Sequence, residues 1–367
     1  MTTADVLLSD GVLAVVRTLE PGDAEALHDL HERVSDESLR LRFFTLARGS
    51  AHKYVEHVLA SVDTLAIVAE VGGRIVAFAT AEPLDARTSE VAFLVADELH
   101  GHGVGTLLLE HIAALARDRG IRRFQAEVLS ENHRMAEVFT EAGFRVGKRF
   151  ETGVQILEMD ISITAEAQDA ADRREFLAES RSLAPMLAPR SVAVYGVRRD
   201  GTGIGATVLR SIRAGGYDGE LVAIHPSAPA LEGVTALPSA SAHAERLDLA
   251  IIAVPAPRAL EALEDAGAAG IPAAVVISSG FGEMGVAGAE LQRMLAVRAR
   301  MLGMRIIGPN CLGLVCNDPQ TRLNATFNDQ LPPTGGFAVA SQSGGVGIVL
   351  MDQATRSGLG IRYFVSL

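Results

Sequence analysis

The stretch Leu99-His-Gly-His-Gly-Val-Gly-Thr-Leu-Leu-Leu-Glu-His111 sets three glycines at alternate positions directly before a run of helix-forming residues. Gly101, Gly103 and Gly105 remove the Cβ atoms from one side of a turn, so that a ligand can approach the main-chain N–H groups closely. Apolar residues then recur every three or four positions, which is typical of a helix that faces a core. The unpaired N–H groups at the N-terminus of a helix, together with its dipole, attract anions, most often phosphate. The stretch therefore predicts a phosphate-binding loop that leads into a buried helix.

The spacing of the glycines limits the kind of phosphate site. The pattern is G-x-G-x-G followed by Thr106, with no lysine. It matches neither the G-x-G-x-x-G of a dinucleotide fold nor the G-x-x-x-x-G-K-[ST] of a P-loop. A second glycine pair, in Gly143–Arg149 (GFRVGKR), is one residue too short for a P-loop and has Arg149 where a magnesium-binding hydroxyl must stand. Neither nucleotide motif is therefore predicted.

Length, composition and charge define the class of protein. A chain of 367 residues with 48% hydrophobic side chains can form two or three domains with buried cores. The 45 acidic and 33 basic residues give a net charge of −12, which argues against nucleic acid and anionic membranes as partners. No apolar run reaches the length of a membrane span and no signal sequence opens the chain, so a cytoplasmic protein is expected. Cys311 and Cys316 are expected to be packed thiols, since no CxxC pair suggests structural zinc.

The first 162 residues predict one α+β domain. Strand-like and helix-like segments alternate through it, with the glycine loop and its helix near the middle. Gly72 and Gly73 join two β-rich runs, which is typical of a hairpin. The charged, alanine-rich residues 163–186 have little apolar periodicity and are expected to form a helical linker.

Residues 187–317 follow a different pattern, in which short apolar strands alternate with helix-length segments. Strands that are apolar on both faces predict a parallel sheet covered by helices, the doubly wound α/β arrangement. Ligands bind beyond the carboxyl ends of the strands in such sheets, where this chain has turns rich in glycine, serine and proline. The candidate binding residues in these turns are Gly196, Gly205, Pro226, Val254, Pro255, Ser278 and Ser279.

Residues 318–367 begin another unit. After LPPTGG, residues 331–336, a strand, a helix and a second strand are predicted. Because a single βαβ unit cannot bury its own sheet, this segment is expected to be the start of a further domain in a longer protein.

Residues 1–162 resemble the GNAT acetyltransferase superfamily. The acyl-CoA loop of that family, [RQ]-x-x-G-x-[GA], corresponds to His100–Gly105, with histidine in place of Arg or Gln. Glu90 before the loop, and Glu-Asn and Ala-Gly-Phe after the next strand, follow in the order of the family. The resemblance implies that the backbone of Leu94 and Val95 pairs with the pantetheine arm of acetyl-CoA. It further implies a diphosphate site at Gly101, His102, Gly103, Val104, Gly105 and Thr106, and a cofactor contact from Asn132.

Residues 188–367 are similar to the CoA-binding front of NDP-forming acyl-CoA synthetases, relatives of the succinyl-CoA synthetase α subunit. The matching motifs are PRSVAVYG, LDLAIIAVPA, VVISSGFGE, IIGPNCLG and SQSGGVG. The resemblance implies a Rossmann-like CoA-binding domain over 187–317 and the start of a flavodoxin-like domain over 318–367. Val197 and Arg198 replace small residues of the family's CoA loop, and His225 replaces an asparagine. The phosphohistidine and the ATP-grasp module of the family lie downstream of the last residue.

A GNAT domain placed before such a synthetase body resembles the bacterial protein lysine acetyltransferases of the Pat type. The resemblance implies an acetyl-CoA-dependent lysine N-acetyltransferase that inactivates AMP-forming acyl-CoA synthetases, with the second domain as an acyl-CoA sensor. The expected partners are therefore protein substrates, and the sequence is compatible with an oligomer. The alternatives are a component of an NDP-forming acyl-CoA ligase and a non-catalytic CoA-binding regulator.

Glu90 is the candidate catalytic residue. A lysine ammonium has no lone pair, so transfer from a thioester needs a general base, and Glu90 is the carboxylate in the strand SEVAFLVA, residues 89–96. The alternative is a solvated charge at the end of a strand. Phe139 or Val138 stands where many GNAT enzymes carry a tyrosine as general acid, so the thiolate is expected to leave without that help.

Two further groups of residues allow other interpretations. His100, His102 and His111 lack a carboxylate or cysteine at a spacing that completes a tetrahedral site, so no metal is expected. Arg40 and Arg42 either form a solvated face or, by resemblance to Pat-type proteins, lie near the acceptor groove.

Overall fold

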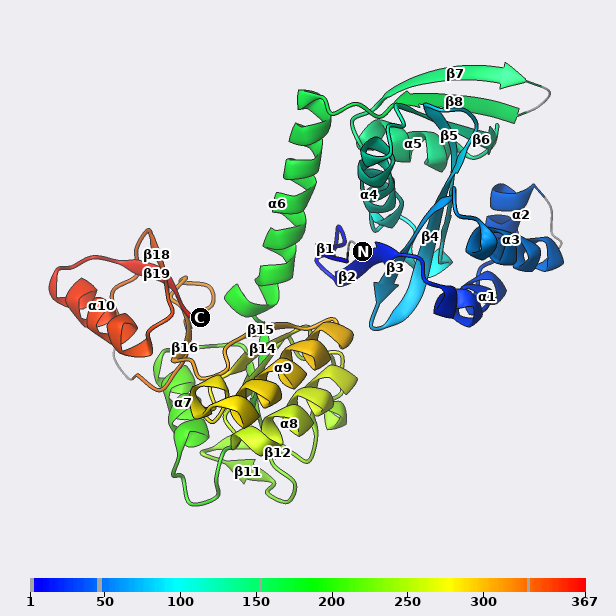
Figure 1. Ribbon diagram of the computed structural model, residues 1–367. Coiled ribbons are helices and arrows are strands. Elements are labelled where there is room, and N and C mark those ends of the chain that lie inside the picture. The colour runs from blue at the N-terminus through cyan, green and yellow to red at the C-terminus, as the bar shows by residue number, and fades with distance from the viewer. Residues whose placement is uncertain (1–2, 45–47, 152–153, 329–330) are drawn as a thin grey trace. The chain divides into compact units, whose positions relative to one another are not determined.

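The computed structural model describes residues 3–44, 48–151, 154–328 and 331–367 (Figure 1). The chain divides into two compact units, which comprise residues 1–181 and 182–367. Within the four described ranges, no helix has both the length and the apolar character that crossing a bilayer requires.

The first unit is built on one eight-stranded sheet. Its strand order is β1-β2-β3-β4-β5-β6-β8-β7, and neighbouring strands run antiparallel except for the parallel pair β5–β6. Gly72 and Gly73 connect β3 to β4, which confirms the predicted hairpin. The strands are β1 Ala4–Leu7, β2 Leu13–Thr18, β3 Leu65–Val71, β4 Arg74–Pro83, β5 Thr88–Val95, β6 Arg123–Leu129, β7 Arg145–Glu151 and β8 Val154–Asp160.

Helices cover both faces of this sheet. Figure 1 shows α1, α2 and α3 on one side of the strands and α4 and α5 on the other. The longest helix, α6, follows β8 and contains all but the first two residues of the linker predicted at 163–186. The helices are α1 Ala24–Arg33, α2 Asp36–Phe43, α3 Arg48–Ala60, α4 Val104–Asp118, α5 His133–Glu141 and α6 Ala165–Leu187, with short 3-10 turns η1 Pro21–Asp23 and η2 Asp97–Leu99.

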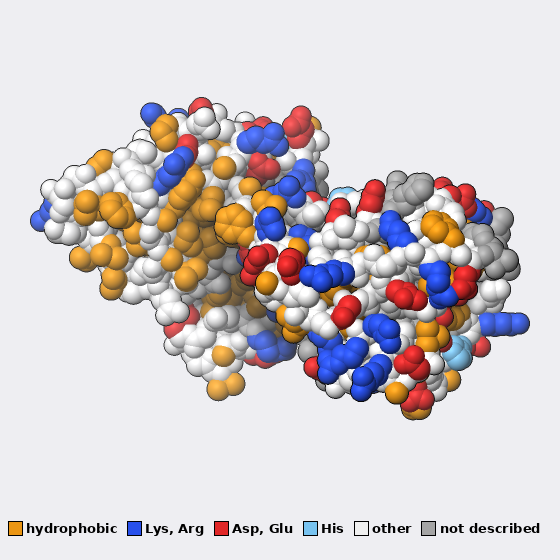
Figure 2. Space-filling model, turned by 90° about the horizontal axis from the view of Figure 1, so that it is seen from above, with side chains coloured by type: hydrophobic (Ala, Val, Ile, Leu, Met, Phe, Trp, Pro, Cys, Tyr) orange, Lys and Arg blue, Asp and Glu red, His pale blue; other side chains and the backbone are white. Residues whose placement is uncertain are grey.

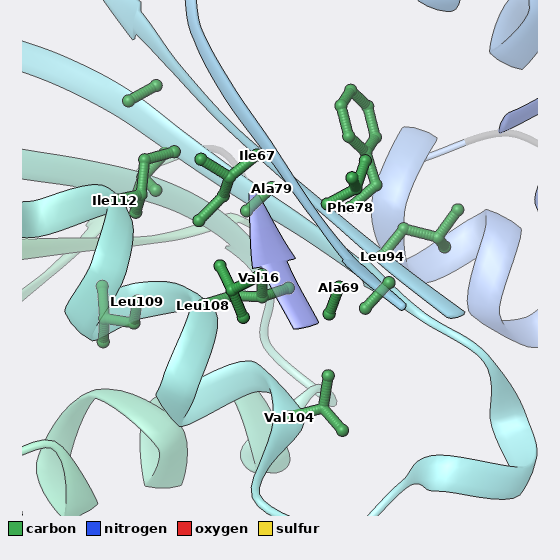
Figure 3. Close-up of a cluster of buried hydrophobic side chains, with 14 of the residues drawn as sticks. Val16, Ile67, Ala69, Phe78, Ala79, Leu94, Val104, Leu108, Leu109 and Ile112 are labelled. Carbon is green, nitrogen blue, oxygen red and sulfur yellow. The ribbon is translucent and has the colours of Figure 1, made fainter. Parts of the chain in front are cut away.

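The core of the first unit lies between α4 and the sheet. Figure 3 shows Leu108, Leu109 and Ile112 of α4 among side chains of β2, β3 and β4. All three are fully buried, which confirms the predicted core-facing helix. Burying an aliphatic side chain of this size contributes about 1.5–3 kcal/mol. The helix is therefore anchored firmly, and so is the glycine loop from which it starts.

The second unit contains a seven-stranded sheet that is parallel apart from its short edge strand β11. Its order is β11-β12-β10-β9-β13-β14-β15. The residues of β9, β13 and β14 are all buried, as the predicted doubly wound arrangement requires. The elements are β9 Ser191–Tyr195, α7 Ile204–Ala214, β10 Glu220–Ile224, β11 Ala230–Leu231, β12 Val234–Leu237, η3 Ala240–Ala242, β13 Leu249–Ile252, α8 Ala256–Ala268, β14 Ala273–Val276, η4 Gly282–Met284, α9 Val286–Met301 and β15 Arg305–Ile307.

A four-stranded sheet of order β17-β16-β19-β18 completes the second unit. The strand, helix and strand expected after LPPTGG are β18 Phe337–Ser341, α10 Gly344–Arg356 and β19 Ile361–Ser366. Strand β16, Gly313–Cys316, pairs with β17, Leu323–Thr326, and with β19. Hydrophobic side chains gather at the left of Figure 2, the side on which Figure 1 shows β18 and α10. Residues of β18 and α10 expose large apolar side chains, among them Phe337, Val346 and Val349, whereas the central strands of the parallel sheet are buried.

Candidate functional site

The glycine loop ends in a helix N-terminus that no side chain caps. Gly103 is the residue before α4 and has a left-handed backbone, with φ of +80°. The first N–H groups of a helix have no partner within the helix, so those of Val104, Gly105 and the residue after them are available to a ligand. The side chains of Val104 and Thr106 are buried, and their burial leaves the outer side of this turn to the backbone. The predicted diphosphate site therefore has the donors that such a group needs.

The turn between β1 and β2 supports this loop. The backbone N–H of Ser9 donates to the carbonyl of His102 at 2.9 Å. The ring Nδ1 of His102 lies 2.7 Å from Oδ2 of Asp10. The His102 side chain is thus directed at a carboxylate, and its backbone N–H donates to the carbonyl of Leu99 at 3.3 Å. His102 therefore shapes the loop, and the N–H groups at the start of α4 are the donors for a diphosphate.

The three glycines do not clear a single side of the loop, which corrects the interpretation made from the sequence. A Cβ on Gly101 would meet nothing within 4 Å. A Cβ on Gly103 would lie 3.6 Å from Cβ of Ser9, and one on Gly105 would lie 3.5 Å from a methyl group of Val138. Gly103 is required by its positive φ, whereas Gly101 has both a positive φ and open space before it.

Strands β5 and β6 diverge beside the loop. They pair over Thr88–Glu90 and Arg123–Gln125, yet both strands continue well past these residues. On its other edge β5 remains paired with β4 as far as Val95. Main-chain groups of β5 beyond Glu90 therefore face an opening, into which an extended chain with amide groups can fit.

Leu94 and Val95 lie on this diverging part of β5. Leu94 is buried, while Val95 is partly exposed. The ring Nε2 of His100 lies 3.1 Å from the carbonyl oxygen of Val95. His100 thus contacts the strand edge that the resemblance assigns to the pantetheine arm.

Glu90 lies at the last paired position before the opening and is flanked by other carboxylates. Its partner on β4 is Glu82, and its partner on β6 is Gln125. Glu127 is two residues further along β6, so it shares the same face of the sheet. Burial raises the pKa of Glu90 most, and the charge of Glu127 raises it further. Arg42 lowers this pKa, and the charge of Glu82 raises it by the smallest of the four effects. Glu90 is therefore a stronger base than an exposed glutamate.

Helices α2 and α3 bring an arginine and a tyrosine to these carboxylates. The Tyr54 hydroxyl donates to Oε1 of Glu82 at 2.6 Å and lies 2.8 Å from Oγ1 of Thr80. The Arg42 guanidinium stacks 4.7 Å from the centre of the Tyr54 ring. Burial raises the pKa of Tyr54 to about 12, so its hydroxyl stays protonated. Sequence reasoning missed Tyr54 and Glu82, because neither belongs to a motif and only the strand register brings them to Glu90.

The remaining predicted residues of this unit have structural partners. Arg40 pairs with Glu131, whereas Arg42 faces the carboxylates. The Asn132 side chain caps α5 by accepting from the N–H of Met135 at 3.3 Å. Its contact with a cofactor stays a prediction.

The position that many GNAT enzymes give to a tyrosine is apolar here. Phe139 is fully buried and packs near Phe93, with ring centres 6.1 Å apart. Val138 is partly buried beside Gly105. Neither side chain can donate a proton to a leaving thiolate.

Histidines and cysteines of the described ranges do not form a metal centre. No group of three His, Cys, Asp or Glu side chains in those ranges has a geometry that could hold a metal ion. Cys311 and Cys316 are free and buried, and burial raises the pKa of Cys311 to about 11.

A cavity of about 980 Å³ lies at the carboxyl ends of the parallel strands in the second unit. It is placed beside β9, where the strand order reverses between β10 and β13, as expected for an open α/β sheet. Gly205 packs against Gly196, since a Cβ on Gly205 would lie 2.5 Å from the Gly196 carbonyl oxygen. The other six predicted residues line the cavity, namely Gly196, Pro226, Val254, Pro255, Ser278 and Ser279.

The two departures from the synthetase motif have clear places in this cavity. His225 accepts from the N–H groups of Ser227 and Ala228 at Nδ1, at 3.2 and 3.1 Å. An asparagine oxygen would make similar turn contacts, so the histidine preserves the turn. Val197 is buried, and Arg198 lines the cavity.

Comparison with known proteins divides the chain in the same way. The description "acetyltransferase (GNAT) family" matches residues 30–144, and "CoA binding domain" matches residues 190–317. Over 179 residues the chain is 36% identical to acetate–CoA ligase (ADP-forming) I of Archaeoglobus fulgidus. This match covers 49% of the chain and 26% of the ligase. Over 171 residues the chain is 28% identical to acetyltransferase Pat of Mycolicibacterium smegmatis. This match covers 44% of the chain and 50% of that protein. The GNAT domain of Streptomyces lividans PAT, a solved structure, is 43% identical and covers 43% of this chain and 96% of that domain, with a TM-score of 0.41.

Proposed function

We infer that this chain, a GNAT N-acetyltransferase joined to a CoA-binding domain of the ADP-forming acyl-CoA synthetase type, transfers acetyl groups from acetyl-CoA to lysine side chains of proteins. The observation that carries the proposal is the position of Glu90. It stands where β5 and β6 diverge, on the strand that precedes the glycine loop. A base at this place can reach an amine that approaches a thioester held along β5.

The chemistry needs a neutral amine and a stabilised leaving group. Glu90 takes a proton from the lysine ammonium, directly or through a water. The amine lone pair then attacks the thioester carbonyl carbon, the carbon–sulfur bond breaks, and CoA leaves as the thiolate. The nitrogen gives its second proton to water, which leaves the neutral amide. Because a thiolate is a weak base, its departure does not require the proton donor that Phe139 and Val138 fail to supply.

The acceptors we propose are AMP-forming acyl-CoA synthetases, whose catalytic lysine would be acetylated and thereby inactivated. Support comes from the similarity of this chain to an acetyltransferase named Pat. The test is to incubate the full chain with labelled acetyl-CoA and a panel of purified AMP-forming synthetases. Label on a lysine with a matching loss of synthetase activity is expected. Absence of label on every member of the panel would overturn this acceptor class.

The second unit is proposed to sense acyl-CoA. Its cavity is lined by residues of the CoA-binding motif, and ligand binding there can influence the first unit if the ligand prefers one arrangement of the chain. Ser279, an exposed lining residue, offers a way to block the cavity. With a sensor, the dependence of transfer rate on acetyl-CoA departs from a hyperbola in the parent chain and becomes hyperbolic in Ser279→Trp.

A second function, in acyl-CoA ligase chemistry, is favoured by the similarity of this chain to an ADP-forming acetate–CoA ligase. The chain spans about a quarter of the length of that ligase. The two functions are separated by an assay for acetyl-CoA formation from acetate, CoA and ATP. Formation of acetyl-CoA by a preparation that labels no protein lysine would favour the ligase.

A further inference from the structure

We propose that Glu82 binds the ammonium group of the acceptor lysine beside Glu90, and that Tyr54 is the residue that positions Glu82. This inference rests on the proposed acetyl transfer to lysine. It assigns the binding of the acceptor to a carboxylate separate from the proposed base.

The strand register places the two carboxylates together. Glu82 and Glu90 are direct partners in the antiparallel β4–β5 pair, so their Cβ atoms are about 4.5–5.5 Å apart. Two negative charges directly opposite each other destabilise a sheet. The fold gains nothing from this pair by itself, whereas a cation placed between the two side chains would relieve the repulsion.

The contacts of Glu82 hold its carboxylate while leaving room for a ligand. Tyr54 donates to Oε1 at 2.6 Å, and Oε2 lies 3.3 Å from Nε2 of the exposed His57 ring. A carboxylate has about four acceptor positions, so these contacts leave others free. The Glu82 side chain keeps 32% of its surface exposed, which makes those positions accessible to an incoming amine.

Tyr54 is itself fixed on three sides, which suits a positioning role. Because its proton goes to Glu82, the hydroxyl accepts from Thr80 at 2.8 Å. Thr80 precedes Glu82 by two residues on β4, so all three groups lie on one face of the sheet. The Arg42 guanidinium covers the Tyr54 ring at 4.7 Å. Tyr54 therefore gives Glu82 a defined direction that a flexible surface glutamate lacks.

The two carboxylates take different parts in the reaction. An ammonium group has three N–H donors, so one can bind Glu82 while another faces Glu90. When the proton that faces Glu90 passes to an oxygen of its carboxylate, an N–H bond breaks and an O–H bond forms. The neutral amine keeps its hydrogen bond to Glu82 and attacks the thioester carbonyl carbon, so that an N–C bond forms as the carbon–sulfur bond breaks and CoA leaves as the thiolate. The nitrogen then gives one of its two remaining protons to water, which leaves the neutral amide. Glu90 is the base because it borders the opening between β5 and β6, whereas Glu82 is one strand further away.

The charges that face Glu90 come from every neighbouring element. They are Glu82 on β4, Glu127 on β6 and Arg42 on α2. On α3, Tyr54 and His57 contact Glu82. Removing the negative charge of Glu82 alone therefore lowers the pKa of Glu90.

The experiment compares Glu82→Gln and Tyr54→Phe with the parent, in the full chain, with a purified AMP-forming acetyl-CoA synthetase as the acceptor. Glu82→Gln should raise the KM for the acceptor about tenfold or more, because a charge-assisted hydrogen bond is lost. It should also move the acidic limb of kcat/KM to lower pH. Tyr54→Phe should raise the same KM without moving that limb, because the charge of Glu82 remains. The KM for acetyl-CoA should stay unchanged in both variants.

Glu56→Gln is the matched control, since Glu56 is an exposed carboxylate two residues from Tyr54 on α3. It should leave every parameter at the parent value, and thermal unfolding should show that all the variants are folded. An acceptor KM within twofold of the parent for Glu82→Gln would overturn the inference. If Glu82→Gln gives that result while Glu90→Gln is inactive, the proposed acetyl transfer stands and only the role of Glu82 is refuted. If Glu90→Gln retains full activity, the proposed mechanism itself fails.

Discussion

Replacing Gly101 or Gly103 by alanine separates backbone strain from direct contact with a ligand. Both glycines have nearly the same left-handed backbone, with φ of +81° and +80°. Alanine costs about 1–2 kcal/mol in this conformation. The two variants therefore carry the same strain, but only the new methyl group at Gly101 points into open space.

The backbone strain determines how much acetyl-CoA affinity both variants lose. If the loop relaxes and acetyl-CoA binding must restore it, 1–2 kcal/mol corresponds to a Kd about 5–30-fold higher for either variant. At Gly103 the methyl group would meet Cβ of Ser9 at an ordinary 3.6 Å, so no further loss is expected. At Gly101 the methyl group would occupy the approach of the diphosphate, which should weaken binding by about another tenfold or more.

Calorimetric titration of the full chain with acetyl-CoA measures both effects, in a Ser279→Trp background that blocks the second cavity. Gly105→Ala serves as the control, because Gly105 is helical and its Cβ would make an ordinary 3.5 Å contact with Val138. It should bind acetyl-CoA as the parent does. Equal losses for Gly101→Ala and Gly103→Ala would refute the placement of the diphosphate on the open side of Gly101.

Three further predictions concern pH and the second unit. His31 is fully buried, and burial lowers its pKa from 6.5 to about 4. Because the unfolded chain binds a proton at this residue more readily, the free energy of unfolding should fall by about 3 kcal/mol between pH 7 and pH 4. Denaturant titrations should show this loss in the parent but not in His31→Leu. Because the pKa of Glu90 is raised on folding, its ionisation destabilises the fold as pH rises past its unfolded value; Glu90→Gln should therefore raise the unfolding temperature more at pH 7 than at pH 4, and an equal shift at both would contradict the burial of this charge. Ser279→Trp should abolish acetyl-CoA binding to the second cavity in calorimetry, and an unchanged number of binding sites would count against that cavity.

Local patterns made much of the fold predictable. The hairpin at Gly72 and Gly73 depends on neighbouring residues alone, and the core-facing side of α4 follows from a helical repeat. The parallel sheet of the second unit was predictable because its strands are apolar on both faces. In each case, the information lies within a few residues of the element that it describes.

Features that depend on distant contacts were not predictable in the same way. Helix α3 has a weak apolar pattern, so nothing local indicates that it delivers Tyr54 to the sheet. Glu82 meets Glu90 through the register of β4 and β5, which the sequence does not display. The direction of each glycine Cβ also depends on the β1–β2 turn and on α5, and for this reason the interpretation of the three glycines as one bare side was wrong.

The most direct test of the proposed function is acetyl transfer by the parent chain and by Glu90→Gln. A purified AMP-forming acetyl-CoA synthetase is incubated with each protein and acetyl-CoA near neutral pH, and mass spectrometry locates and quantifies acetyl-lysine over time. The proposal predicts a modified lysine with the parent and a rate about 10²- to 10⁴-fold lower with Glu90→Gln, at unchanged acetyl-CoA affinity. A rate for Glu90→Gln within a few fold of the parent would contradict it.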